Sequence, residues 1–210
     1  MIGVFGGTFD PIHFGHLRSA VEICEALDLE RVHMIPAADP PHRGRPRVSA
    51  VERLAMLELA LAEQQRLIAD DRELRRTGPS YMVDTLTEMK EEFGRSQALI
   101  LGVDAFAKLA SWHRWQSLFD LAHIVVIARP DSKPKWDYPL RSEIFKRVVG
   151  RPEGLTESEA GRIWFSQLTQ LQISATKIRA LIEDDRSPRY LLPAAVLQHI
   201  QKSKFYRNRD

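Results

Sequence analysis

The stretch from Gly6 to His16, which reads GGTFDPIHFGH, constrains this chain more than any other. The apolar run Ile2–Phe5 before it predicts a buried strand, and the apolar positions within 17–27 fall on one face of a helix. Glycine permits close backbone approach, and the free N–H groups of a helix start attract anions. His13 and His16 add donors on one side of that helix. The stretch therefore predicts a phosphate site, with a nucleotide as the expected ligand.

Simpler interpretations of this stretch have to be weighed. A Gly-Gly pair is a common turn, and a single His at a helix start is often only a cap. The Gly-x-Gly-x-x-Gly fingerprint and the P-loop pattern are both absent from it, which argues against an ordinary dinucleotide fold and against a P-loop. A zinc site is an alternative, but His13 and His16 have no obvious third and fourth ligand in the sequence. We expect no metal held by the protein itself.

Size and composition favour an ordinary globular protein. The 210 residues, 44% of them hydrophobic, suffice for one α/β domain covering residues 1–210. The net charge of +2 gives no reason to expect nucleic acid or a membrane as partner, and assembly into a homo-oligomer is left open. The lone Cys24 rules out an internal disulfide. No signal peptide or apolar span is visible, so we expect a cytoplasmic protein.

Further short strands are expected at 32–35, 66–69, 98–101, 123–128 and 163–165, with helices between them. Strand, helix and strand at this spacing predict parallel crossovers, and the run 124–127 is apolar without alternation, as in buried parallel strands. The fold class expected is α/β, with a doubly wound and mostly parallel sheet. Helices are also expected at 140–149 and 191–200, and the basic tail 202–209 is expected to be solvated.

Three loops after predicted strands carry candidate ligand-binding groups. The loop 36–47 holds prolines and several cations, which could bind an anion or form a solvated basic turn. Asp104 follows Gly102 at the end of a strand, where open α/β sheets bind ligands, and could accept ribose hydroxyls or cap a helix over 105–110. Arg129 ends the next strand and could reach phosphate, although a surface arginine is about equally expected.

Three helix entries are also visible. Ser49 and Glu52 form a capping-box pattern at the start of an amphipathic helix. Ser80 is a candidate N-cap for the next helix. Ser174 is a good N-cap for a third, whose first turns hold hydroxyls and cations that could bind a second anion, namely Thr176, Lys177 and Arg179. Taken alone, this last entry is more simply a capped amphipathic helix.

Two of these motifs carry a family resemblance. Residues 7–16 resemble the His-x-Gly-His signature of the nucleotidylyltransferases, and residues 173–179 resemble their second signature, Ile-Ser-Ser/Thr-x-x-x-Arg. With two further motifs, the chain resembles bacterial nicotinate-nucleotide adenylyltransferases over nearly its whole length. The resemblance implies a Rossmann-like nucleotidylyltransferase fold and adenylyl transfer from ATP to nicotinate mononucleotide, in NAD biosynthesis. It names His16, His13 and Arg179 as catalytic and assigns ATP to Gly6, Gly7, Thr8, His13, His16, Gly102, Asp104, Ser174, Thr176 and Arg179.

The resemblance also implies a site for the pyridine nucleotide. Pro79-Ser80-Tyr81-Met82 resembles the family's Pro-Ser-Tyr-Thr, which meets the nicotinate carboxylate. Met82 stands where the family usually has Thr, so one hydroxyl donor is lost. Trp112 is placed against the nicotinate ring and the backbone N–H of His113 at the carboxylate, whereas Trp115 is expected in the core. The substrate residues expected are His42, Arg43, Ser80, Tyr81, Met82, Trp112, His113 and Arg129.

No dedicated carboxylate cage for a metal is visible, so Mg²⁺ is expected to bind mainly through the ATP phosphates. Two alternatives stay open. One is a transferase acting on another phosphate, such as phosphopantetheine or nicotinamide mononucleotide. The other is a nucleotide-binding module that releases no pyrophosphate.

Overall fold

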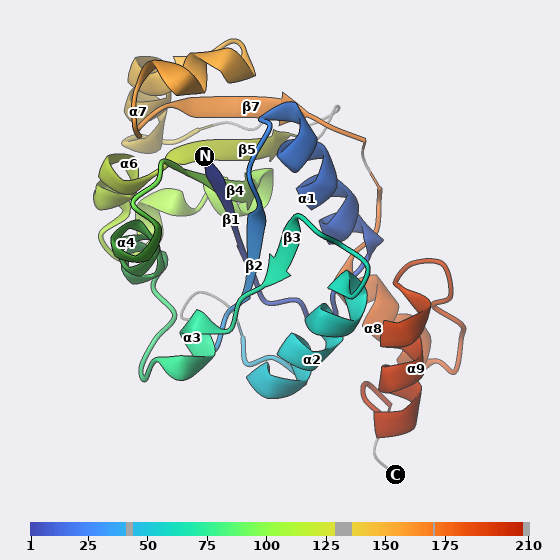
Figure 1. Cartoon of the computed structure of the whole chain (residues 1–210). Helices are drawn as coiled ribbons and strands as arrows, with labels where there is room; N and C mark the ends of the chain where they lie inside the picture. The colour runs from blue at the N-terminus through green and yellow to red at the C-terminus, as the bar shows by residue number, and fades with distance from the viewer. Residues whose placement is uncertain (41–43, 129–135, 170, 208–210) are drawn as a thin grey trace.

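A sheet of parallel strands forms the centre of the computed structural model, which describes residues 1–40, 44–128, 136–169 and 171–207. Within these residues the strand order is β3-β2-β1-β4-β5-β7-β6, and every neighbouring pair runs parallel (Figure 1). The strands are β1 (Ile2–Gly7), β2 (Val32–Pro36), β3 (Leu67–Ala69), β4 (Gln97–Gly102), β5 (His123–Ala128), β6 (Val148–Val149) and β7 (Ile163–Gln167). The expected doubly wound, parallel α/β fold is confirmed.

Helices cover both faces of this sheet (Figure 1). Those contributing to the core on one face are α1 (Phe14–Ala26), α2 (Ala50–Leu61), α8 (Ala175–Glu183) and α9 (Ala194–Ser203). Those on the other face are α4 (Met82–Phe93), α5 (Val103–Phe106), α6 (Leu118–Leu121) and α7 (Leu140–Arg147). The short helix α3 (Arg72–Arg75) and 3₁₀ turns at Leu109–Ser111, Trp115–Ser117 and Pro152–Glu157 complete the described elements. None of the helices in the described residues is long and apolar enough to cross a bilayer.

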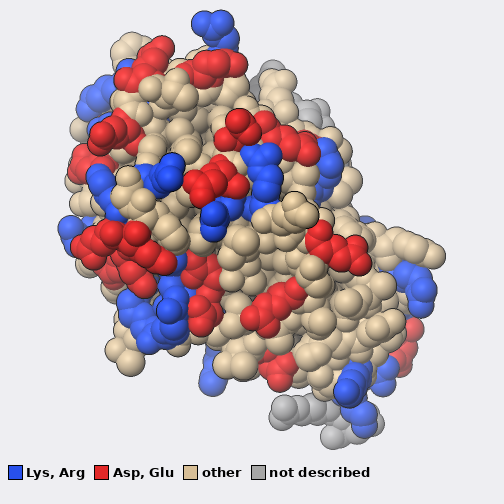
Figure 2. Space-filling view, viewed as in Figure 1, with Lys and Arg blue, Asp and Glu red and all other residues tan. Residues whose placement is uncertain are grey.

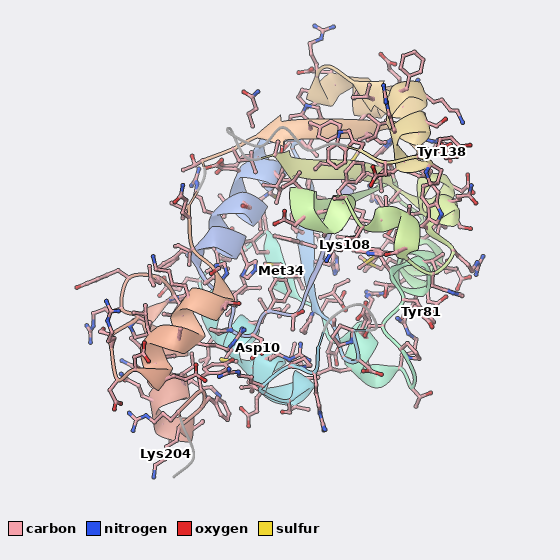
Figure 3. All side chains as sticks on the ribbon, turned by 180° about the vertical axis from the view of Figure 1, so that it is seen from behind. Asp10, Met34, Tyr81, Lys108, Tyr138 and Lys204 are labelled. Atoms are coloured by element: carbon pink, nitrogen blue, oxygen red, sulfur yellow. The ribbon has the colours of Figure 1, made fainter. Side chains whose placement is uncertain are left out.

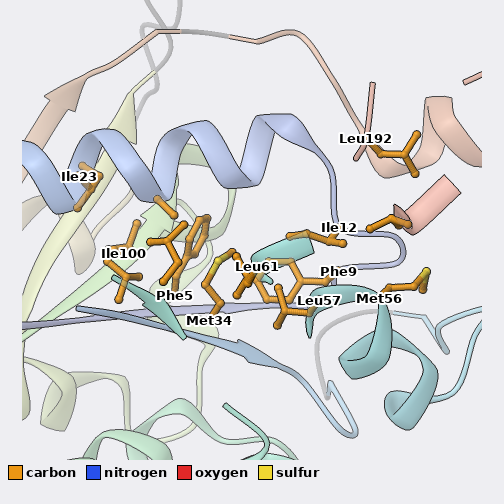
Figure 4. Close-up of a cluster of buried hydrophobic side chains, with 14 of the residues drawn as sticks. Phe5, Phe9, Ile12, Ile23, Met34, Met56, Leu57, Leu61, Ile100 and Leu192 are labelled. Atoms are coloured by element: carbon orange, nitrogen blue, oxygen red, sulfur yellow. The ribbon is translucent and has the colours of Figure 1, made fainter. Parts of the chain in front are cut away.

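The central strands are buried on both faces, which explains their continuous apolar sequences. In β5, Ile124 and Val126 join the core cluster under α4 and α6, whereas Val125 joins the cluster under α1. The α1 side also includes Phe5 of β1 and Phe9 of the turn after it, together with side chains of α2 (Figure 4). The two cores therefore fix β1 from both sides, so the turn that follows it starts from a rigid base.

The strand order reverses between β1 and β4. From β1 the sheet runs through β2 to β3 on one side, and through β4, β5 and β7 to β6 on the other. The connections that leave β1 and β4 therefore go to opposite faces, and in open α/β sheets the carboxyl ends of two such strands form the crevice that binds ligands. Gly7 ends β1 and Gly102 ends β4, so both glycines lie at this crevice.

Two helix boundaries and the burial of the C-terminal tail differ from the expectation. The helix expected at 140–149 ends at Arg147, because Val148 and Val149 pair with β7 as a short edge strand. The last helix begins at Ala194, because Pro193 takes the N-cap position and the Leu191 carbonyl accepts the Phe14 N–H. The tail is not solvated throughout, since Tyr206 is buried.

A buried ion network ties the edge of the sheet to α4. The Asp70 carboxylate lies 2.7 Å from His33 Nδ1 and 2.7 Å from Arg72 Nη2, and Arg72 also contacts Glu92 of α4 at 3.1 Å. Burial alone would raise the pKa of the Asp70 carboxyl, but the hydrogen bonds from His33 and Arg72 outweigh it and hold the pKa well below its usual range. The network couples β2 and β3 to the helix whose start borders the crevice.

We predict that Asp70→Asn lowers the free energy of unfolding by roughly 2–4 kcal/mol, because it leaves the buried Arg72 without its main partner. Urea denaturation followed by circular dichroism measures the change. The matched control is Asp71→Asn, which breaks the solvent-exposed pair with Arg75 and should cost less than about 0.5 kcal/mol. Equal losses in both variants would contradict a special role for the buried network.

Candidate active site

The turn after β1 is shaped by close packing around Phe9. This residue has a φ of 48° and a side chain only 2% exposed. A Cβ on Gly7 would lie 2.7 Å from the Phe9 ring, so a side chain cannot be placed there without displacing the ring. The predicted need for glycine at this position therefore has a definite cause, which is the close approach of the backbone to a buried aromatic ring.

Two imidazoles follow at the start of α1. His13 is the N-cap residue, and its carbonyl accepts the N–H groups of His16 and Leu17. The rings of His13 and His16 are stacked, with centroids 3.7 Å apart and an interplanar angle of 23°, and the Phe9 ring meets His16 edge-on at 5.1 Å. This packing fixes both rings beside the helix start.

His13 is neutral in the substrate-free protein. Its side chain is 4% exposed, and burial lowers its pKa from 6.5 to about 4 because a charged imidazole loses its hydration there. Its Nδ1 is buried and has no hydrogen-bond partner within the described residues. A phosphate brought to this site would favour the protonated ring and could accept its hydrogen bond.

The start of α8 lies against the same turn. Ser174 caps this helix as predicted, accepting the Lys177 N–H at 3.2 Å. Arg179 donates to the backbone oxygen of Asp10 at 2.6 Å and to Thr176 Oγ1 at 3.2 Å. A Cβ on Gly15 would lie 3.5 Å from the Ile173 carbonyl oxygen. The two helix starts are therefore neighbours, as a shared triphosphate site requires.

Asp10 and Arg53 hold this region together, and the sequence analysis assigned neither a role. The buried Asp10 carboxylate accepts the Tyr206 hydroxyl at 2.7 Å and the Arg47 N–H at 2.9 Å. Arg53 of α2 is 1% exposed and donates to the carbonyls of Thr8 and Ala37, each at 2.7 Å. The position of Arg53 was a usable signal, since it shares the apolar face of its helix with the buried Met56 and Leu57.

The start of α4 borders the other side of the turn. A Cβ on Gly6 would lie 2.5 Å from Met82 Cε, so the Met82 side chain lies directly against the end of β1. The N-cap residue of α4 is Tyr81, and the expectation that Ser80 caps this helix is wrong. Ser80 Oγ instead accepts the Asp39 N–H, and the Ser80 N–H donates to the Asp39 carbonyl, both at 3.0 Å. These bonds tie the loop after β2 to the α4 start.

The turn that carries Trp112 and His113 reaches the same place. The His113 ring stacks on Tyr81, with centroids 4.2 Å apart and an interplanar angle of 25°. Trp112 is half-buried and packs against the core on this face, as does Trp115, which meets Phe119 edge-on. The His113 ring, for which no role was expected, therefore helps to position the start of α4.

Gly102 and Asp104 lie at the end of β4. Gly102 is the N-cap residue of α5, which begins at Val103, so Asp104 lies in the first turn and does not cap a helix over 105–110. The reason is that the backbone becomes helical two residues earlier than expected. Asp104 is exposed at this edge of the sheet, and its predicted role at the ribose stays a prediction.

Three predicted substrate residues, His42, Arg43 and Arg129, lie outside the described residues. In the same loop as His42, the Arg47 side chain is paired with Glu183. Within the part of the chain that the structure describes, no group of three or more His, Cys, Asp or Glu could hold a metal ion.

The face of the molecule shown in Figure 2 carries acidic and basic side chains intermixed with each other.

Comparison with known proteins gives a consistent result. The model of the cytidylyltransferase-like family matches residues 4–181. A probable nicotinate-nucleotide adenylyltransferase of Methylococcus capsulatus is 47% identical over 208 residues, covering 98% of this chain and 99% of the relative. One from Chromohalobacter salexigens is 50% identical, covering 93% and 90%.

The fold comparison agrees. The solved structure of Plasmodium falciparum nicotinic acid mononucleotide adenylyltransferase complexed with NaAD superposes with a TM-score of 0.74. It is 16% identical to this chain, and the match covers 98% of this chain and 96% of that one.

We predict that the substrate-free protein loses stability as the pH falls from 6.5 to about 4, because the unfolded chain binds a proton at His13 that the folded chain refuses. Above pH 6.5 this contribution is complete, and it amounts to roughly 3 kcal/mol at most. In His13→Gln the slope of unfolding free energy against pH should shrink in this window. Part of the slope remains, since burial also lowers the pKa of His123.

Urea titrations at a series of pH values measure this slope. The matched control is His113→Gln, which removes an exposed imidazole and should keep the slope of the parent protein. A parent slope that survives unchanged in His13→Gln would show that His13 is not the buried neutral group described above.

Proposed function

Because the chain belongs to the cytidylyltransferase-like family, and within it to the nicotinate-nucleotide adenylyltransferases, we propose that it transfers the adenylyl group of ATP to nicotinate mononucleotide. The products are nicotinate adenine dinucleotide and pyrophosphate. The observation that carries the proposal is the meeting of two helix starts, where Arg179 of α8 donates to Asp10 in the turn before α1. A helix start with hydroxyls or imidazoles binds phosphate, and two of them side by side suit a triphosphate.

The reaction needs no covalent enzyme intermediate. The 5′-phosphate of the mononucleotide is an anion at neutral pH, so it is a competent nucleophile without a general base. One of its oxygens forms a bond to the α-phosphorus of ATP, while the bond from that phosphorus to the bridging oxygen breaks and pyrophosphate leaves. The work left to the protein is to align the two anions and to neutralise charge on the phosphoryl oxygens.

The described residues divide between these two tasks. His16, with His13 and Thr8, would face the α-phosphate and the attacking oxygen. Ser174, Thr176 and Arg179 would hold the β- and γ-phosphates; a hydroxyl that accepts a hydrogen bond, as Ser174 does, can still donate its own hydrogen. Mg²⁺ would arrive with ATP on its phosphate oxygens and neutralise charge on the leaving pyrophosphate.

The pyridine end would bind at the start of α4. The backbone N–H of Met82, the first residue of α4, would receive the nicotinate carboxylate, because a helix start favours an anion; the Tyr81 N–H already donates to the Pro79 carbonyl at 3.0 Å. The ring would stack on Trp112, which adds roughly 0.5–2 kcal/mol for a cationic ring on an indole face. The hydrogen bonds between Ser80 and Asp39 and the ring contact between His113 and Tyr81 support this by fixing the backbone that presents that N–H group.

A pyrophosphate-release assay with Mg²⁺, ATP and a panel of mononucleotides tests the reaction. Product formation with nicotinate mononucleotide supports the proposal. Preference for nicotinamide mononucleotide or for phosphopantetheine would replace the substrate, and ATP binding without pyrophosphate release from any of them would indicate a nucleotide-binding module.

We predict that His16→Ala folds but loses adenylyl transfer by about 10²–10³-fold in kcat, the usual cost of removing one donor that stabilises the transition state. Steady-state kinetics at saturating substrates measures the change, with thermal unfolding to confirm folding. Arg18→Ala is the control on the same helix, since it removes only an exposed pair with Glu22. Turnover of His16→Ala within a few-fold of the parent enzyme would remove His16 from catalysis.

We predict that Met82→Thr raises the preference for the acid over the amide mononucleotide by about 3–10-fold in the ratio of kcat/KM, because a hydroxyl at the helix start adds a donor to the carboxylate. Competition between the two mononucleotides in one assay measures the ratio. Met82→Leu keeps an apolar side chain and should leave the ratio unchanged. A ratio that moves equally in both variants would point to the volume of residue 82 and not to its hydroxyl.

A further inference from the structure

The C-terminal segment returns to the turn that follows β1. After α9, Lys204 and Tyr206 both adopt a left-handed backbone, with φ of 56° and 62°, so the chain folds back on itself. The Tyr206 side chain is 6% exposed, and its hydroxyl donates to Asp10 Oδ1 at 2.7 Å. In Figure 3, Asp10 lies where α2 faces the C-terminal helices, while Lys204 marks the end of α9. A residue 196 positions away in sequence thus contacts the centre of the site.

Arg179 contacts the main chain of Asp10 more closely than it contacts the Asp10 carboxylate. One carboxylate oxygen is held by Tyr206 and the other by the Arg47 N–H at 2.9 Å. Arg179 Nη1 is 4.0 Å from Asp10 Oδ2, at the limit of an ion pair, and makes its short contact of 2.6 Å with the Asp10 backbone oxygen. The guanidinium is therefore anchored by the main chain and not neutralised by a bidentate carboxylate.

The other groups near the Asp10 carboxylate offer it few alternative hydrogen-bond donors. Arg53 from α2 is committed to the carbonyls of Val48, Thr8 and Ala37. Burial, followed by the hydrogen bond and the charge of Asp10, raises the pKa of the Tyr206 hydroxyl far above its usual range, so Tyr206 remains a donor at every accessible pH. Among the described side chains, the cation that forms an ion pair with the Asp10 carboxylate is Arg179, at 4.0 Å from Oδ2, so Arg179 is the candidate to approach more closely if the Tyr206 donor is removed.

We propose that Tyr206 is a positioning residue for ATP: by holding the Asp10 carboxylate, its hydroxyl keeps the Arg179 guanidinium available for the outer phosphates. This inference rests on the proposed function, which places Arg179 at those phosphates. When a buried carboxylate loses a hydrogen-bond donor, a conformation that supplies another donor becomes favourable, because an unsatisfied charged group in the interior costs free energy. In Tyr206→Phe that other partner is Arg179, and the carboxylate then competes with ATP.

The test varies ATP and nicotinate mononucleotide separately in the adenylyl-transfer assay. In Tyr206→Phe the KM for ATP should rise about tenfold, the effect of one hydrogen bond to a charged group, while the KM for the mononucleotide stays within about twofold. Equal KM changes for both substrates, or a fall in kcat alone, would overturn the proposal. A parent enzyme that makes no product defeats the proposed function instead, so the two failures are distinguishable.

The double variant Asp10→Asn/Tyr206→Phe separates positioning from loss of structure. A neutral amide does not compete for a guanidinium, so the KM for ATP should return toward that of the parent enzyme, even though stability falls further. A KM for ATP that stays high or rises again would overturn the proposal. If Tyr206→Phe does not fold, Asp10→Asn alone serves: its neutral amide cannot draw Arg179 away, so its KM for ATP should stay within about twofold of the parent enzyme, and a tenfold rise would overturn the proposal.

The matched control is His199→Ala. His199 ties α9 to α2 through Glu52 at 3.0 Å and makes no described contact with Asp10. It should lower the thermal unfolding midpoint without changing the KM for ATP. A rise in that KM equal to the rise in Tyr206→Phe would mean that any loosening of the C-terminal segment weakens ATP binding, and the specific role of the Tyr206 hydroxyl would be rejected.

Discussion

Hydrogen bonding to one buried residue, Asp10 in the turn after β1, holds the active-site region together. Its carboxylate accepts hydrogen bonds from Tyr206 of the C-terminal segment and from the Arg47 N–H in the loop after β2, and its backbone oxygen accepts one from Arg179 of α8. Buried polar groups are tolerated only where donors reach them, so these three segments must close on the turn for the protein to fold. The same closure brings the start of α8 beside the start of α1. The geometry of the site is thus a consequence of satisfying Asp10.

A buried cation, Arg53, also stabilises this region. Its buried guanidinium donates to three main-chain carbonyls, one in the loop after β1 and two in the loop after β2. Irregular loops carry unpaired backbone groups, and a fork of donors can satisfy several of them at once. Arg53 therefore stiffens the two loops that border the crevice. A site that works by alignment and charge neutralisation needs loops of this kind, because misplaced donors lose most of their effect.

Much of the fold was predictable from the sequence, because parallel strands buried on both faces read as short apolar runs. The runs at 98–101 and 123–128 fell within one residue of β4 and β5. The errors came where long-range contacts override local preference. Val148 and Val149 pair with β7 and do not extend the expected helix, and Ser80 is hydrogen-bonded to Asp39 and does not cap α4. Neither partner is visible from the local sequence.

The local sequence determined the two helix starts with their imidazoles and hydroxyls, since each motif spans only a few residues and its backbone is set by nearby glycine, proline and capping side chains. The sequence also carried the family, because the motifs are specific. Only the tertiary structure decided that the starts of α1 and α8 are neighbours, that Arg53 is buried under both loops, and that Tyr206 reaches Asp10. These contacts join residues far apart in the chain, and they form because buried polar groups must find partners wherever the packed sheet and helices bring them.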